Sequence, residues 1–367
     1  MSARASYGLL TAALGTGLLA LGLAFSIQMI GAVVGPFDLL APVAEGGAAE
    51  LRVWRPASAS RDSIFETRRR ARAWSTALGG RARVRDVDSL AALAADGRTV
   101  VAVGDARRLT AGELAELREF VARGGGAILA GPVAALDPDG AARGGAAMAE
   151  LLGARVAALP PGAATALVAA RRGPLAAALA PGQRLAVRGG EALVAIDDAA
   201  SELRWADASG GAPAPGARGA SLRRELGAGR LVWLGAGPDL SAAGVLTPAN
   251  ELGRLTAAAF AWAAREPFAA SAAAGLDARV RRQGPRRHLV DVTNRGVGAS
   301  APGASLVVHL NAAAERVAVA RTILQQAEPR FRFHPREQEV EIDLPALAAG
   351  ESLSFTLDLD PPATGAA

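Results

Sequence analysis

The chain has 367 residues, of which 51% are apolar and only 4% aromatic, so it is long enough for two domains with cores built from Ala, Val and Leu. All 40 basic residues are arginine, and a net charge of +5 with 35 interspersed acidic residues does not indicate a nucleic-acid partner. Cysteine is absent, which excludes disulfides, a thiol nucleophile, thiolate metal sites and iron–sulfur clusters.

The N-terminal segment carries no charged residue from Tyr7 to Phe37, which is longer than the roughly 20 residues that cross a bilayer. We therefore predict an uncleaved transmembrane signal anchor in residues 1–36 and a Gly/Ala/Pro-rich linker over 37–50. Arg4 precedes the apolar stretch and acidic residues follow it. By the positive-inside rule, this predicts a single-pass inner-membrane protein with a cytoplasmic N-terminus and its bulk outside the cytoplasm.

Alternating strand and helix patterns over residues 51–265 predict an α/β domain with a doubly wound, mostly parallel sheet. The clearest pattern is a strand–helix–strand unit over 99–131. Thr110 stands three residues before Glu113, the spacing of a capping box, so a helix is predicted to begin there. Three glycines end that helix before a second buried strand at 127–130.

The other elements of this region are predicted in chain order from apolar periodicity and turn residues. They are strands at 51–55, 83–87 and 229–235, helices at 63–78, 89–95, 148–152, 174–179 and 248–264, and antiparallel hairpins between 184 and 226.

A linker is predicted over 266–275 because this stretch is rich in alanine and lacks a clear period. Beyond it, residues 276–360 show six or seven short stretches with a period of two, which predicts an Ig-like β-sandwich. Residues 361–367 are predicted to be a tail. The fold class is therefore α/β plus all-β with an N-terminal transmembrane helix.

Ligands of doubly wound sheets bind beyond the carboxyl ends of the strands. Six residues that follow predicted strands are the ligand-binding candidates: Ser60, Arg61, Asp62, Asp105, Arg107 and Asp239. The alternative is that they cap helices and solvate loops. The three histidines, at 288, 309 and 334, lie on different predicted strands of the sandwich, so we expect no metal site. No catalytic motif and no cofactor motif is present.

The stretches VVAVGDARRLTAGELAELREFVARGGGAILAG and GAGRLVWLGAGPDL resemble the class I glutamine amidotransferase-like superfamily, in its membrane-anchored, non-catalytic form. DVTNRG and IDLPALAAGESLSFTLDL are similar to bacterial Ig-like domains of polysaccharide and transport proteins. Catalytic members of the superfamily place a cysteine after the strand that corresponds to 127–130, with a histidine later. This α/β region has neither, so the resemblance implies no amidotransferase activity.

These features favour a non-enzymatic accessory subunit of an envelope export or polysaccharide assembly, anchored in the membrane and acting through a protein partner or a glycan. One alternative is a carbohydrate-active hydrolase in which Asp105 and Asp239 converge within about 10 Å. Another is a sensor that binds a small anion through Arg61 and Arg107, which requires an open, basic pocket.

Overall fold

A computed structural model describes residues 49–360 with internal gaps, and everything below concerns these described residues. The gaps are 60–63, 80–81, 105–108, 131–145, 155, 159–165, 180–182, 187–192, 196–200, 207–218, 236–250, 272, 274, 312 and 322–329. All of the described residues belong to one compact unit.

The predicted transmembrane helix lies outside the described residues. Within them, no helix is both long enough and apolar enough to span a bilayer. The described residues form nineteen strands and only four α-helices. The predicted fold class is therefore corrected: its N-terminal transmembrane helix is not supported. Membrane anchoring through that helix and the predicted inner-membrane location are not supported either.

A six-stranded sheet in the order β10-β11-β4-β3-β1-β2 organises the first part of the described chain. β1, β2, β3, β4 and β11 pair in parallel, and β10 runs antiparallel to β11 at one edge. Their bounds are β1 Glu50–Trp54, β2 Arg83–Val87, β3 Thr99–Gly104, β4 Gly126–Ala130, β10 Ser221–Leu226 and β11 Gly229–Leu234.

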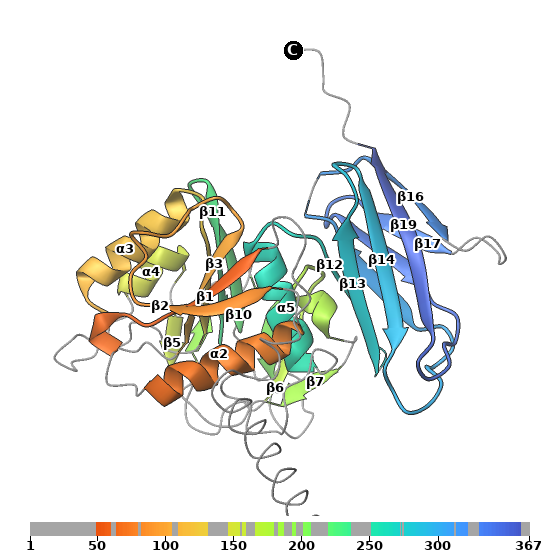
Figure 1. The fold of residues 1–367 in the computed structure, drawn as a ribbon, viewed down its shortest axis with the longest axis horizontal. Coiled ribbons are helices and arrows are strands. Elements are labelled where there is room, and N and C mark those ends of the chain that lie inside the picture. The colour runs from red at the N-terminus through yellow and green to blue at the C-terminus, as the bar shows by residue number, and fades with distance from the viewer. Residues whose placement is uncertain are drawn as a thin grey trace, which may run out of the picture. The chain divides into compact units, whose positions relative to one another are not determined.

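Helices cover both faces of this sheet, as Figure 1 shows. On one face, α2 (Ile64–Leu78) and α5 (Glu251–Ala263) pack with alternate strand residues in a core that includes Trp74 and Trp262. On the other face, α3 (Ala111–Ala122) packs with α4 (Ala146–Leu152) against the opposite strand residues. Burial on both faces explains why the central strands are apolar throughout.

The capping box predicted for α3 is present. Thr110 accepts a hydrogen bond from the Glu113 backbone N–H at 3.1 Å, and the Glu113 carboxylate accepts one from the Thr110 N–H at 2.7 Å. The helix predicted over 89–95 is wrong, because that segment forms turns. There the backbone N–H groups of Leu90 and Ala91 donate to the carboxylate of Glu116 at 2.8 and 3.0 Å.

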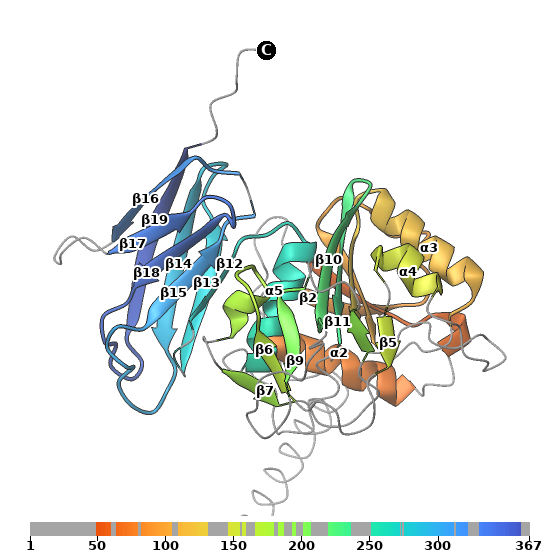
Figure 2. The ribbon, with the colours of Figure 1, turned by 180° about the vertical axis from the view of Figure 1, so that it is seen from behind.

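Two small antiparallel sheets combine β7, β8 and β9, from the stretch 184–226 for which hairpins were predicted, with β5 and β6, which precede that stretch (Figure 2). They pair β5 with β8, and β6 with both β7 and β9, while β10 of the same stretch joins the large sheet. A short 3-10 helix, η2, follows β6, and another, η1, follows β1. The bounds are η1 Ala57–Ala59, β5 Val156–Ala158, β6 Ala166–Ala169, η2 Ala176–Ala178, β7 Arg184–Ala186, β8 Leu193–Ala195 and β9 Leu203–Ala206.

The last part of the described chain forms two four-stranded antiparallel sheets, β12-β15-β18-β17 and β13-β14-β19-β16, around a common apolar core. β12 lies inside the segment for which a linker was predicted, and the division of the chain into domains stays a prediction. The bounds are β12 Phe268–Ser271, β13 Leu276–Arg282, β14 Arg287–Asn294, β15 Ser305–His309, β16 Arg316–Arg321, β17 Phe331–His334, β18 Glu339–Asp343 and β19 Ser352–Asp360.

His288 of β14 is buried on the inner side of its strand, opposite Leu357. Neither ring nitrogen has a hydrogen-bond partner among the described residues. Burial, assisted by the charge of Arg282, lowers the pKa of His288 to about 4. The folded protein therefore holds this histidine neutral, whereas the unfolded chain takes up a proton near pH 6.5.

We expect the free energy of unfolding to fall as pH drops from 6.5 to 4, because only the unfolded state binds the proton of His288 in that window. At pH 4.5 the contribution is about 2–3 kcal/mol. His288→Leu is expected to remove this part of the pH dependence. The measurement is urea unfolding of both proteins at pH 7 and pH 4.5. If the free energy of unfolding of His288→Leu falls between pH 7 and pH 4.5 by as much as that of the wild-type protein, His288 does not cause this pH dependence.

Candidate functional site

All six ligand-binding candidates from the sequence, Ser60, Arg61, Asp62, Asp105, Arg107 and Asp239, lie outside the described residues. The strands that precede them are described. β1 and β3 pair in parallel, and β2 flanks β1 on its other side, so the chain order changes direction between β1 and β3. In open α/β sheets this is where a crevice forms.

One carboxylate at this edge of the sheet already has its partners. Glu113 accepts hydrogen bonds from the backbone N–H and hydroxyl of Ser58 and from Thr110. Burial alone would raise the pKa of Glu113, but these hydrogen bonds outweigh it and hold the pKa below its ordinary value. Glu113 therefore fixes the loop after β1 to the start of α3 rather than serving as an acid.

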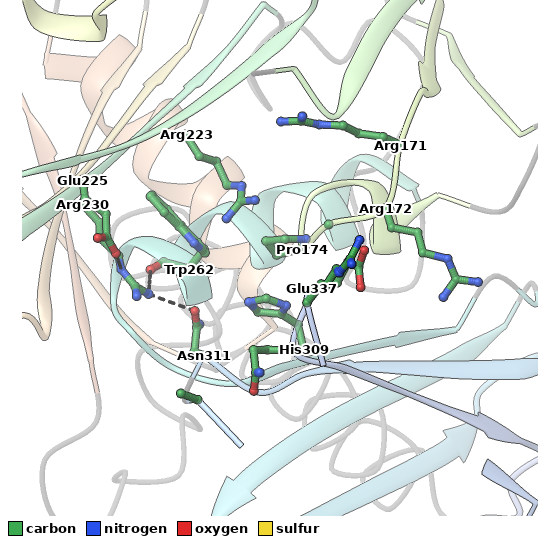
Figure 3. Close-up of a pocket in the computed structure, with 14 residues that line it drawn as sticks. Arg171, Arg172, Pro174, Arg223, Glu225, Arg230, Trp262, His309, Asn311 and Glu337 are labelled. Atoms are coloured by element: carbon green, nitrogen blue, oxygen red, sulfur yellow. Dashed lines mark hydrogen bonds and ion pairs between the residues drawn. The ribbon is translucent and has the colours of Figure 1, made fainter. Parts of the chain in front are cut away.

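The structure shows a different cavity, of about 550 Å³, where the segments around β10, β11 and α5 meet the sandwich (Figure 3). Its lining is rich in arginine. The lining residues are Arg171, Arg172, Gly173, Pro174, Arg223, Glu225, Arg230, Trp262, His309, Asn311, Ala313, Arg336, Glu337 and Gln338. We call this cavity the arginine pocket.

Trp262 of α5 supports two of these arginines. The guanidinium carbons of Arg223 and Arg230 each lie 5.0 Å from the centre of the Trp262 ring, within cation–π distance. Arg230 also pairs with Glu225 at 3.1 Å and donates to Asn311 at 2.9 Å. Because both guanidinium groups are held in place before any ligand arrives, their remaining N–H donors are pre-oriented.

A buried carboxylate, Glu202, positions the other side of the arginine pocket. It forms an ion pair with Arg223 and accepts hydrogen bonds from the backbone N–H groups of Leu175 (2.8 Å) and Ala176 (3.2 Å). Its own backbone carbonyl accepts from the N–H of Ala170 at 2.8 Å. Glu202 thus places the segment that carries Arg171 and Arg172.

Two buried titratable groups modify the charge near the arginine pocket. Burial and the positive charges of Arg223 and Arg230 lower the pKa of His309 to about 4, so its imidazole is neutral near pH 7. Burial and the neighbouring charge of Glu202 raise the pKa of Glu339 to about 7. Glu339 lies directly opposite His309 across β15 and β18.

Asn311 joins the sandwich to α5 beside the arginine pocket. Its backbone is in the left-handed region (φ 52°), which asparagine adopts more readily than most residues. Its amide nitrogen donates to the backbone carbonyls of Ala261 and Glu266, while its amide oxygen accepts from Arg230. Asn311 therefore shapes the pocket wall with its hydrogen-bonding capacity already used.

The arginine pocket has more positively than negatively charged side chains in its lining. Five guanidinium groups and two carboxylates line it, and Glu202 and Glu341 pair with Arg223 and Arg172. Among the described residues, no three His, Asp or Glu side chains group as a metal site requires. Sequence reasoning missed this site. The only local signal is the pair Arg171-Arg172 before Gly-Pro, and nothing in the sequence shows that it meets β10, α5 and the sandwich.

Comparisons with known proteins give structural likenesses only. No family model matches the chain, and the search of curated proteins found no match. Solved structures similar to it include a β-galactosidase from the Antarctic haloarchaeon Halorubrum lacusprofundi (TM-score 0.41, 15% identity), covering 89% of this chain and 42% of that one. An α-L-fucosidase from Paenibacillus thiaminolyticus (TM-score 0.40, 15% identity) covers 90% and 51%, and a β-galactosidase from Bacillus circulans (TM-score 0.39, 14% identity) covers 87% and 42%.

These findings correct the predicted resemblance. The expected glutamine amidotransferase-like domain with an Ig-like domain is matched by no family model, and the similar structures are glycoside hydrolases instead. The chain spans about 40–50% of their length, and TM-scores below 0.5 assign no activity to it.

We expect Glu202→Ala to lower the free energy of unfolding by about 3 kcal/mol, because it removes the ion-pair partner of Arg223 and the acceptor for two backbone N–H groups. The matched control is Glu150→Ala, which removes an exposed ion pair with Arg118 and should cost less than about 1 kcal/mol. Chemical denaturation of both variants measures the difference. Equal, small effects would contradict the organising role of Glu202.

Proposed function

We propose that this chain binds an anionic saccharide and that the arginine pocket holds its acidic group. The observation that supports this is the arginine-rich lining itself, with Arg223 and Arg230 pre-oriented on Trp262. Guanidinium groups match carboxylate and sulfate oxygens geometrically as well as in charge. A cavity of about 550 Å³ lies within the size range of small-molecule sites.

A saccharide suits the lining better than a bare anion does. Glu337 lines the same pocket as the arginines, and a carboxylate there would repel a purely anionic ligand. It would instead accept hydrogen bonds from hydroxyl groups. An acidic sugar offers both a carboxylate for the arginines and hydroxyls for Glu337. An acidic sugar combines the two kinds of ligand, a carbohydrate and a small anion, that the sequence analysis left as alternatives. Its proposed site is the arginine pocket, however, and not the residues predicted from the sequence.

The test is isothermal titration of the purified full-length protein with sodium galacturonate, galactose, sulfate and phosphate at low salt. We expect galacturonate to bind and galactose, which lacks the carboxylate, to bind at least tenfold more weakly. Added NaCl should weaken the binding of galacturonate. Equal affinities for the acidic and the neutral sugar, or no binding of any acid, would contradict the proposal.

Variants locate the binding. Arg223→Gln combined with Glu202→Gln removes a guanidinium without leaving a buried carboxylate unpaired, and is expected to weaken galacturonate binding at least tenfold. The matched control is Arg281→Gln, because Arg281 is an exposed arginine that pairs with Asp291 on the sandwich, outside the pocket. If Arg281→Gln loses galacturonate binding and the double variant keeps it, the binding site lies outside the arginine pocket.

A second candidate function is the hydrolase in which Asp105 and Asp239 act together. The observation that favours it is strand order: β3 and β11 flank β4 and run parallel to it, so their carboxyl ends lie two strand spacings apart, about 10 Å. Asp105 directly follows β3, and Asp239 comes five residues after β11. Paired carboxylates of glycosidases are separated by about 5–10 Å.

For this candidate we expect wild-type protein to release nitrophenol from at least one of a panel of nitrophenyl glycosides. Asp105→Asn and Asp239→Asn should each lower kcat at least about 100-fold, because each would remove one member of the acid–base pair. Circular dichroism confirms that the variants fold. Wild-type rates in both variants would exclude these carboxylates from catalysis.

A further inference from the structure

A buried carboxyl group lies directly behind the wall of the arginine pocket. Glu339 of β18 is only 2% exposed, and in the antiparallel pairing of β15 with β18 it stands opposite His309, which lines the pocket. Opposite residues of antiparallel strands share one face of the sheet. Glu337, two residues before Glu339, also lines the pocket (Figure 3). A charge on Glu339 would therefore be close to an anion held in the pocket.

Two other acids behind the pocket have ion-pair partners, whereas Glu339 does not. Glu202 pairs with Arg223, and Glu341 of β18 lies 3.7 Å from Arg172. Glu339 forms no ion pair with any residue that the structure describes, and its Oε1 atom has no hydrogen-bond partner among them. A buried carboxylate without a partner is unfavourable, so this site favours the neutral carboxyl group.

The side chains around Glu339 act on its charge in both directions. Burial has the largest effect, followed by the negative charge of Glu202, and together they raise the pKa of Glu339 to about 7. Glu337 acts in the same direction, while Arg172 and Arg223 oppose it. The other titratable groups on this face of the sheet are His309 on β15, His334 on β17 and Glu341 on β18.

We propose that binding of an acid in the arginine pocket is coupled to proton uptake by Glu339, so that the pocket holds its ligand more tightly when Glu339 is neutral. This coupling rests on the proposed anionic-saccharide function and adds its regulation by pH. An ionised Glu339 repels the carboxylate of the ligand and competes with it for the charge of Arg223, whereas the neutral form does neither. Because coupling is reciprocal, the bound acid in turn favours the protonated form of Glu339.

The direction of the pH dependence follows from this coupling. Below about pH 6, Glu339 is largely neutral with or without a ligand, so the affinity is highest there. As the pH rises through 7, the free protein loses this proton first, and binding then requires a proton from solution. His309, whose pKa is about 4, stays neutral in this range, and a carboxylic acid of ordinary pKa stays ionised. The affinity is therefore expected to fall as the pH rises.

Titration of the wild-type full-length protein with sodium galacturonate tests the coupling without any variant. We expect the affinity to fall at least about fivefold between pH 6 and pH 8.5 at constant ionic strength. At pH 7.5 we also expect the protein to take up a fraction of one proton for each ligand bound. A pH-stat measures this uptake in unbuffered solution after both components have been adjusted to the same pH.

Glu339→Gln tests the residue, because glutamine has nearly the shape of the neutral carboxyl group. We expect this variant to bind galacturonate at pH 8.5 about as tightly as the wild-type protein does at pH 6, with no proton uptake. The matched control is His334→Gln, because His334 stands opposite Glu339 on β17 and histidine also takes up protons between pH 5 and 8. The control should keep the pH dependence.

Failure of the coupling is distinct from failure of the proposed function. If the wild-type protein binds galacturonate equally well at pH 6 and pH 8.5, or if Glu339→Gln keeps the wild-type pH dependence, the coupling to Glu339 is overturned and the anionic-saccharide function stands. If galacturonate does not bind even at pH 6, where the coupling favours it most, the function and the coupling are overturned together.

Discussion

The arginine pocket depends on one buried carboxylate. Taking Glu202 out of water is unfavourable unless its charge is compensated inside the protein. Arg223 forms an ion pair with one carboxylate oxygen, and the N–H groups of Leu175 and Ala176 donate to the other. These partners come from β10 and from the start of η2, so their contacts with Glu202 bring the two segments together. The arginines on both segments then face one cavity as a consequence of the buried charge.

The same carboxylate sets the charge state of its surroundings. Burial and the nearby carboxylate of Glu202 disfavour a second negative charge, and together they raise the pKa of Glu339 to about 7. The arginines in turn disfavour a positive imidazole at His309. Between about pH 4 and pH 7 both groups are thus largely neutral, and the carboxylates of Glu202, Glu225, Glu337 and Glu341 partly balance the guanidinium groups of the pocket.

Local patterns in the sequence predicted local structure. The spacing of Thr110 and Glu113 sufficed for the start of α3, because a capping box involves only residues within one turn. The helix predicted over 89–95 does not form. The carboxylate of Glu116, which is distant in the sequence, accepts hydrogen bonds from backbone N–H groups of this segment and holds it in a turn. The arginine pocket was unpredictable for a similar reason: its walls come from six separated stretches of chain. The family resemblance and the membrane helix rested on composition and pattern alone, and neither is supported.

Arg230 connects the arginine pocket to the junction between α5 and the sandwich. It lies on the Trp262 ring, lines the pocket, and donates to Asn311, whose amide holds the carbonyls at the end of α5. A ligand that binds the remaining N–H donors of Arg230 therefore also restrains this junction, since anything that binds only the assembled arrangement stabilises it.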